Sequence, residues 1–69
     1  MTRHVVFGTG QVGRPLVEAL AAAGHHVVAV NRSGRGRFAD AELVAADATD
    51  PQATGRLCRG AAAVYFCLN

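Results

Sequence analysis

Several residue types and features that would point to other classes of protein are missing from the sequence. It contains no lysine, no isoleucine and no tryptophan, and all seven of its basic residues are arginine. The formal net charge is only +2, and the arginines are scattered along the chain, so composition gives no support to a nucleic-acid partner. No stretch reaches the roughly 18 uninterrupted apolar residues of a membrane helix, and the N-terminus lacks the apolar region of a signal peptide. We therefore expect a cytoplasmic protein with neither a nucleic-acid nor a membrane partner.

What the sequence does contain is enough apolar material for one small packed domain. The chain has 69 residues, of which 51% are hydrophobic and 17% charged, a balance typical of folded rather than disordered proteins. A doubly wound α/β domain needs two βαβαβ halves, typically well over about 100 residues. If the chain has this architecture, residues 1–69 correspond to about half of it.

Alternating apolar runs and helical periodicities predict six elements. The expected order is a strand at 4–7, a helix at 11–23 ended by Gly24, a strand at 27–30, a strand at 42–46, a helix from Pro51 to about Arg59, and a strand at 62–68. Asp50 is a suitable N-cap for the second helix, with Pro51 at its first position. The connection at 38–41 is too short for a full helix, so we expect a turn or a single helical turn there.

This β-α-β-β-α-β order predicts an α/β fold, with a parallel sheet of about four strands and right-handed crossovers, as in a partial Rossmann fold. The sequence ends at Asn69, directly after an apolar strand that no following helix covers. We therefore expect the N-terminal portion of a Rossmann domain, cut off before its second half. It would be completed by a missing C-terminal part or by a homodimer partner.

A glycine-rich segment between the first strand and the first helix predicts a dinucleotide site. It reads Gly8-Thr9-Gly10-Gln11-Val12-Gly13, a GxGxxG motif in its required strand–turn–helix context. Gly8 is expected to make the tight turn, Gly10 to let the backbone approach a pyrophosphate, and Gly13 to let the helix pack closely on the sheet. The N–H groups of Gly10, Gln11 and Val12 would face the phosphates. The alternative is a glycine-rich turn without a ligand.

The end of the second strand indicates which dinucleotide binds. NAD-binding proteins place an Asp or Glu there to hold the ribose 2′-hydroxyl, but this chain has Asn31, followed by Arg32, Ser33 and Arg35. Arginine side chains and a hydroxyl can receive a 2′-phosphate, so we predict NADP rather than NAD. The alternative interpretation of Arg32 and Arg35 is that they are solvated loop charges.

Other polar residues have narrower interpretations. Asp47 follows the third strand and could accept a hydrogen bond from the adenine amino group. His25 and His26 are explained by the helix C-terminus, and we predict no metal site. Cys58 and Cys67 have neither CxxC nor zinc spacing, so we expect two reduced thiols, with redox sensitivity at Cys67 as the alternative.

Together these segments resemble the N-terminal part of the NAD-dependent epimerase/dehydratase family, the extended or atypical short-chain dehydrogenase/reductases. The resemblance is carried by residues 6–14, 24–27, 31–33, 47–51 and 63–65. It implies that Asp47, with its neighbour Ala48, contacts adenine. It also implies that Cys67, Leu68 and Asn69 contact the ribose or nicotinamide side of the cofactor.

Two departures from that family's pattern bear on function. The family's glycine spacing is GxxGxxG, and its first glycine corresponds to Phe7 here. The catalytic Tyr-x-x-x-Lys is absent, because Tyr65 is not followed by a lysine, so no catalytic residue is assigned. We expect the cofactor-binding part of an NADP-dependent oxidoreductase or epimerase. Two alternatives are a non-catalytic NAD(P)-sensing regulatory module and a deazaflavin-dependent NADP reductase, against which the segment 47–51 argues.

Overall fold

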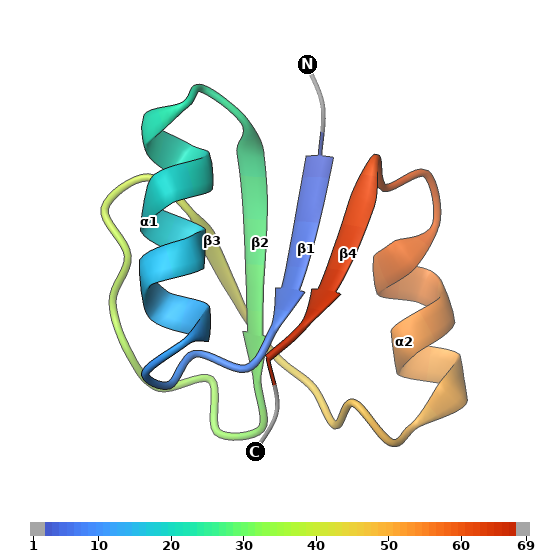
Figure 1. Ribbon diagram of the computed structural model, residues 1–69. Coiled ribbons are helices and arrows are strands. Elements are labelled where there is room, and N and C mark those ends of the chain that lie inside the picture. Colours follow the sequence, from blue (N-terminus) through green and yellow to red (C-terminus); the bar gives the residue numbers. More distant parts are fainter. Residues whose placement is uncertain (1–2, 68–69) are drawn as a thin grey trace.

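The structure is a computed structural model that describes residues 3–67. It is an α/β fold in which one parallel four-stranded sheet lies between two helices (Figure 1). In chain order the elements are β1 (Arg3–Phe7), α1 (Gly13–Ala22), β2 (His26–Asn31), β3 (Glu42–Ala45), α2 (Pro51–Cys58) and β4 (Ala63–Phe66). The strand order across the sheet is β3-β2-β1-β4, which confirms the predicted parallel, partial Rossmann-like fold.

The two central strands, β1 and β2, contain continuous apolar runs because both faces of the sheet are covered there. Along β1, Val5 and Phe7 point to the α2 side, and Val6 points to the α1 side, where Val17 of the helix packs against it. All four of these side chains are at most 1% exposed. Burial on two faces explains why β1 and β2 show continuous apolar runs rather than alternation.

The strands all end at one edge of the sheet, where their last residues are joined by backbone hydrogen bonds. The N–H of Gly8 donates to the Val30 carbonyl at 2.8 Å, and the N–H of Cys67 donates to the Phe7 carbonyl at 2.8 Å. The N–H of Ala46 donates to the Asn31 carbonyl at 2.9 Å. Figure 1 shows the turn after β1, the loop after β2 and the segment after β3 gathered at this carboxyl edge, at the bottom of the view.

The opposite, amino edge is held by side chains. The Arg3 guanidinium donates to the carbonyls of Leu57, at 2.8 Å, and of Arg59, so it caps the C-terminal turn of α2. His4 Nδ1 lies 3.2 Å from the Tyr65 hydroxyl, and the His4 ring lies 4.3 Å from that of His25. These aromatic and basic side chains therefore stabilise the end of the sheet that is remote from the glycine-rich turn.

The observed boundaries differ from the predicted ones by up to two residues. Helix α1 begins at Gly13 rather than at residue 11, because residues 11 and 12 form a turn. Segment 38–41 contains a bend and no helical turn. Strand β4 ends at Phe66, and of the residues predicted to continue it Leu68 lies outside the described part of the chain. Between residues 3 and 67, no helix has the length and apolar character needed to cross a membrane.

Candidate functional site

The turn between β1 and α1 requires glycine at two of its three motif positions in the free protein. Gly8 has a φ of +101°, a conformation that residues with a side chain rarely adopt. A Cβ atom at Gly13 would lie 1.7 Å from the Gly8 carbonyl oxygen, so the helix could not approach the strand as it does. A Cβ atom at Gly10 would meet nothing within 4 Å. Packing within the chain therefore does not explain why residue 10 is glycine. Open space at Gly10 is consistent with a position that a ligand approaches closely.

The first turn of α1 leaves backbone donors available. Its N-cap is Val12, whose side chain makes no capping hydrogen bond and is 65% exposed. No acceptor between residues 3 and 67 pairs with the N–H groups of Gly10, Gln11 or Val12. Unpaired N–H groups at a helix N-terminus, reinforced by the helix dipole, make a favourable site for a phosphate.

The loop after β2 is organised around the side-chain amide of Asn31. Its Nδ2 donates to Thr9 Oγ1 at 3.0 Å and to the Arg35 carbonyl at 2.8 Å. Its Oδ1 accepts from the N–H of Gly34 at 2.6 Å. The residue predicted to select the dinucleotide thus contacts the glycine-rich turn and the arginine-bearing loop together.

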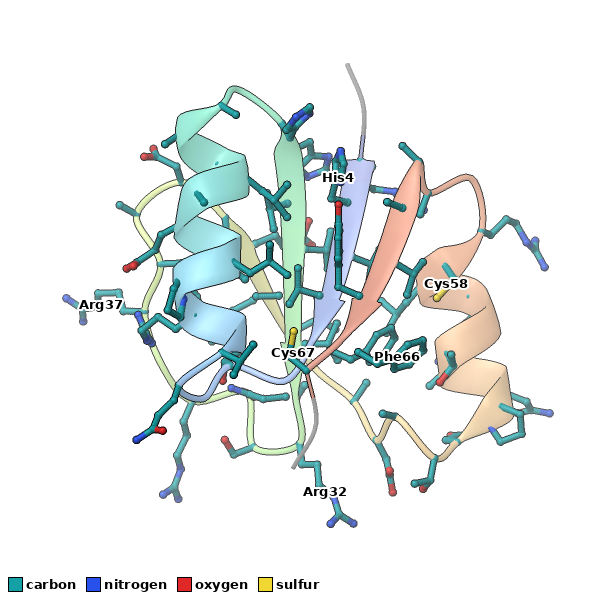
Figure 2. All side chains as sticks on the ribbon, in the orientation of Figure 1. His4, Arg32, Arg37, Cys58, Phe66 and Cys67 are labelled. Carbon is teal, nitrogen blue, oxygen red and sulfur yellow. The ribbon has the colours of Figure 1, made fainter. Side chains whose placement is uncertain are left out.

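Two arginines, Arg32 in this loop and Arg14 in α1, differ in their contacts. Arg32 extends from the carboxyl edge into solvent, with its side chain 83% exposed (Figure 2). Its Nη2 lies 3.5 Å from Asp47 Oδ2. Arg14, the residue after the glycine motif, donates to the Arg37 carbonyl at 3.2 Å and lies 4.3 Å from the centre of the Phe38 ring. Arg14 therefore fastens the end of the loop to α1.

A cleft of about 270 Å³ opens between the ends of β1, β2 and β3. It is lined by Phe7, Gly8, Val30, Arg32, Ala46, Asp47, Ala48 and Thr49. An apolar floor with polar groups at its rim is typical of a site for a flat heterocycle such as adenine. A second, smaller cavity of about 130 Å³ lies between α1 and segment 38–41.

Asp47 already has partners in the free protein. Its Oδ1 accepts from the hydroxyl of Thr49 at 2.7 Å and from the Thr49 N–H at 2.9 Å, while Oδ2 faces Arg32. The Thr49 hydroxyl bond, followed by the Thr49 backbone bond, holds the pKa of the Asp47 carboxyl below its usual value of 3.8. The carboxylate is therefore ionised and oriented at the rim of the cleft.

Other predicted residues are placed as follows. Cys67 follows β4, and its Cβ lies 3.5 Å from the position that a Cβ at Gly13 would occupy, so this residue borders the glycine-rich turn. Leu68 and Asn69 lie outside the described residues. Both cysteines are unpaired and half-buried, in agreement with reduced thiols. Ser33 Oγ accepts from the N–H of Arg35 at 3.0 Å, within the arginine-bearing loop.

Sequence reasoning missed Arg14 and Thr49. Arg14 sits directly after the motif, and a cation at the start of a helix is unfavourable for the dipole unless it has another role, so its position carried a signal. Thr49 lies two residues after Asp47, the spacing of an Asx turn. Arg14 fixes the end of the loop after β2, and Thr49, which also lines the cleft, fixes the Asp47 carboxylate.

Comparison with known proteins agrees with this geometry. A family model described as NAD(P)H-binding matches residues 8–69, which is nearly the whole chain. Neither curated proteins nor solved structures gave a significant match. The matched region begins at the first glycine of the turn and includes the arginine-bearing loop, the cleft and Asp47. The chain therefore belongs to the NAD(P)H-binding family, whose cofactor is a nicotinamide dinucleotide.

Proposed function

We propose that the chain binds NADP(H) in preference to NAD(H), as the cofactor-binding part of an oxidoreductase or epimerase related to the epimerase/dehydratase family. One observation carries the proposal: the unpaired N–H groups before α1 and the exposed Arg32 lie at the same carboxyl edge (Figures 1 and 2). A donor set of this kind suits a ligand with separate phosphates, one on the backbone and one on a guanidinium.

The residues divide into four groups by the part of the cofactor they would hold. The N–H groups of Gly10, Gln11 and Val12 bind the pyrophosphate. Arg32, with Ser33 and Arg35, binds the 2′-phosphate. Asp47 and Ala48 receive the adenine, and residues 67–69 are proposed to contact the nicotinamide side.

The nicotinamide ring supplies hydride acceptance or donation when it is bound. Apart from binding, the chain's own contribution is to orient the Asp47 carboxylate through Thr49, as an acceptor at the cleft. The Asp47–Arg32 ion pair opposes binding of the 2′-phosphate, because the phosphate must compete with this carboxylate for the guanidinium.

A second candidate is a non-catalytic NAD(P)-sensing module, with which the position of Tyr65 is compatible. The Tyr65 hydroxyl lies 3.2 Å from His4 Nδ1, at the amino edge of the sheet and remote from the cofactor edge. The chain has no other tyrosine and no lysine. Tyr65 therefore does not serve as a catalytic acid at the proposed site.

Calorimetric titration with NADPH and NADH tests the proposal on three proteins: the parent chain, Arg32→Asp and Arg56→Asp. Arg56 is exposed in the last turn of α2, so its substitution makes the same charge change far from the carboxyl edge. We expect NADPH to bind the parent chain at least about tenfold more tightly than NADH, since a charge-assisted contact contributes roughly 1.5–3 kcal/mol.

Arg32→Asp should abolish that preference, and Arg56→Asp should keep it. Equal affinity for the two cofactors in the parent chain would contradict the NADP assignment. Loss of the preference in both variants would show a response to net charge alone, rather than to the position of Arg32.

A further inference from the structure

The Asn31 amide connects two segments of the chain at the carboxyl edge. It makes three hydrogen bonds, to Thr9 in the glycine-rich turn and to Gly34 and Arg35 in the loop after β2. Thr9 lies 22 positions from Asn31, so one side chain joins two segments that are distant in sequence. Asn31 itself is half-buried.

The partners of this amide fix its orientation. The Arg35 carbonyl can only accept a hydrogen bond, so it must face the amide nitrogen, and the Gly34 N–H can only donate, so it must face the oxygen. The nitrogen has two hydrogens, and both are used, one on Arg35 and one on Thr9. Asn31 consequently has no amide hydrogen left to offer to a cofactor.

Other contacts also fix the conformation of the loop to which Asn31 is hydrogen-bonded. Ser33 Oγ accepts from the Arg35 N–H, and Gly34 adopts a φ of +69° with so little space that a Cβ there would lie 2.9 Å from that of Ala45. Arg14 anchors the far end at the Arg37 carbonyl. These contacts shape the loop, and the Asn31–Thr9 bond sets its position relative to the glycine-rich turn.

We propose that Asn31 is a positioning residue, which ties the loop that receives the 2′-phosphate to the turn that receives the pyrophosphate through the hydroxyl of Thr9. This inference rests on the proposed function. It makes Thr9, a residue of the pyrophosphate turn, a determinant of the choice between NADP and NAD. A fixed distance between two anion sites favours the ligand that fills both, because less ordering accompanies binding.

The test uses Thr9→Val, which keeps the shape but removes the hydroxyl, and Thr9→Ser, which keeps the hydroxyl. The affinities for NADP⁺ and NAD⁺ are measured by calorimetry on the full chain. We expect Thr9→Val to lower the NADP⁺/NAD⁺ affinity ratio by about fivefold, the effect of one net hydrogen bond. Thr9→Ser should keep the ratio of the parent chain. An equal loss for both cofactors in Thr9→Val, with the ratio unchanged, would overturn the proposal, since the hydroxyl would then serve the shared pyrophosphate.

A second readout needs no cofactor. Hydrogen exchange of the Gly34 amide, which donates to Asn31, should be faster in Thr9→Val than in the parent chain or in Thr9→Ser. Unchanged exchange in Thr9→Val would contradict the positioning role. If the parent chain bound neither dinucleotide, the proposed function would fail, and the exchange measurement would still decide whether Thr9 and Asn31 position the loop.

Discussion

The two helices begin at the same edge of the sheet in opposite ways. At the start of α2, the Asp50 carboxylate accepts from the Gln52 N–H at 3.0 Å, and Pro51 has no N–H that needs a partner. At the start of α1, the N-cap Val12 provides no such acceptor. One helix N-terminus is thus capped by its own chain, while the other has unpaired donors, which we propose bind a phosphate.

The difference shows how one fold separates stability from binding. An uncapped helix end costs roughly 0.5–2 kcal/mol relative to a capped one. The chain tolerates this cost at α1 because the apolar face of that helix packs on the sheet through Val17, with Leu16 and Leu20 beside it. The α2 face of the sheet is less fully covered, and Phe66 on that side is 59% exposed, so α2 depends more on its cap.

The largest expected effect comes from exchanging glycine for alanine in each helix. Gly13→Ala forces a Cβ to within 1.7 Å of the Gly8 carbonyl oxygen, so the helix must move from the sheet. We expect a loss of roughly 3 kcal/mol or more, which approaches the total stability of a domain this small. Gly55→Ala in α2 meets no atom within 4 Å and should raise the free energy of unfolding by about 0.5–1 kcal/mol.

Thermal unfolding followed by circular dichroism compares these two variants with the parent chain. Opposite signs are expected although both changes add one methyl group to a helix. A Gly13→Ala protein that is as stable as the parent chain would show that the close contact between α1 and the turn does not hold the helix in place.

A smaller effect is expected from the cap of α2. Asp50→Ala removes the acceptor for the Gln52 N–H and should lower the free energy of unfolding by about 1 kcal/mol. Affinity for NADPH should not change, because the cap lies outside the proposed donor set. Asp50→Asn, which retains a capping oxygen, is the matched control and should keep most of the stability. A change in affinity larger than the change in stability would place Asp50 in the cofactor site and end the contrast between the two helices.

Most of the fold could be predicted from the sequence because it depends on local patterns. The buried runs in β1 and β2, the Asp50–Pro51 start of α2 and the roles of Gly8 and Gly13 are all visible in short segments. The start of α1 was placed two residues early, because apolar spacing does not distinguish a helical residue from one in the preceding turn.

The internal contacts of the site could not be predicted in this way, because they join residues from different segments. Arg32 meets Asp47 at a separation of 15 residues, and Asn31 meets Thr9 at 22. Such pairs depend on the shape of loops, which composition does not specify. The His4–Tyr65 contact was more accessible: once β1 and β4 are neighbours in register, with Val6 opposite Tyr65, the two side chains share a face.

The smallest expected effect is a pH dependence, which should differ between the turn at residues 47–49 and the turn at residues 8–13. Because hydrogen bonds from Thr49 favour the charged Asp47, the pKa of this carboxyl in the folded chain lies below its ordinary value of 3.8. Its contribution to stability is therefore complete above about pH 3.8 and is lost as the pH falls through the lowered, folded-state pKa. The turn at residues 8–13 contains no titratable side chain and should be indifferent over the same interval.

Titration followed by NMR tests this at the Asp47 carboxyl carbon and at two amides, those of Thr49 and Gly10. Thr49→Ala removes the hydroxyl bond and should raise the pKa of Asp47 toward 3.8, whereas Thr49→Ser should leave it low. The Thr49 amide signal should move in acid, and the Gly10 signal should stay. A Gly10 signal that moved with the Asp47 titration would mean that the turn before α1 and the turn before α2 are coupled across the cleft. The starts of the two helices would then not be independent, and the contrast between a capped and an uncapped N-terminus would fail.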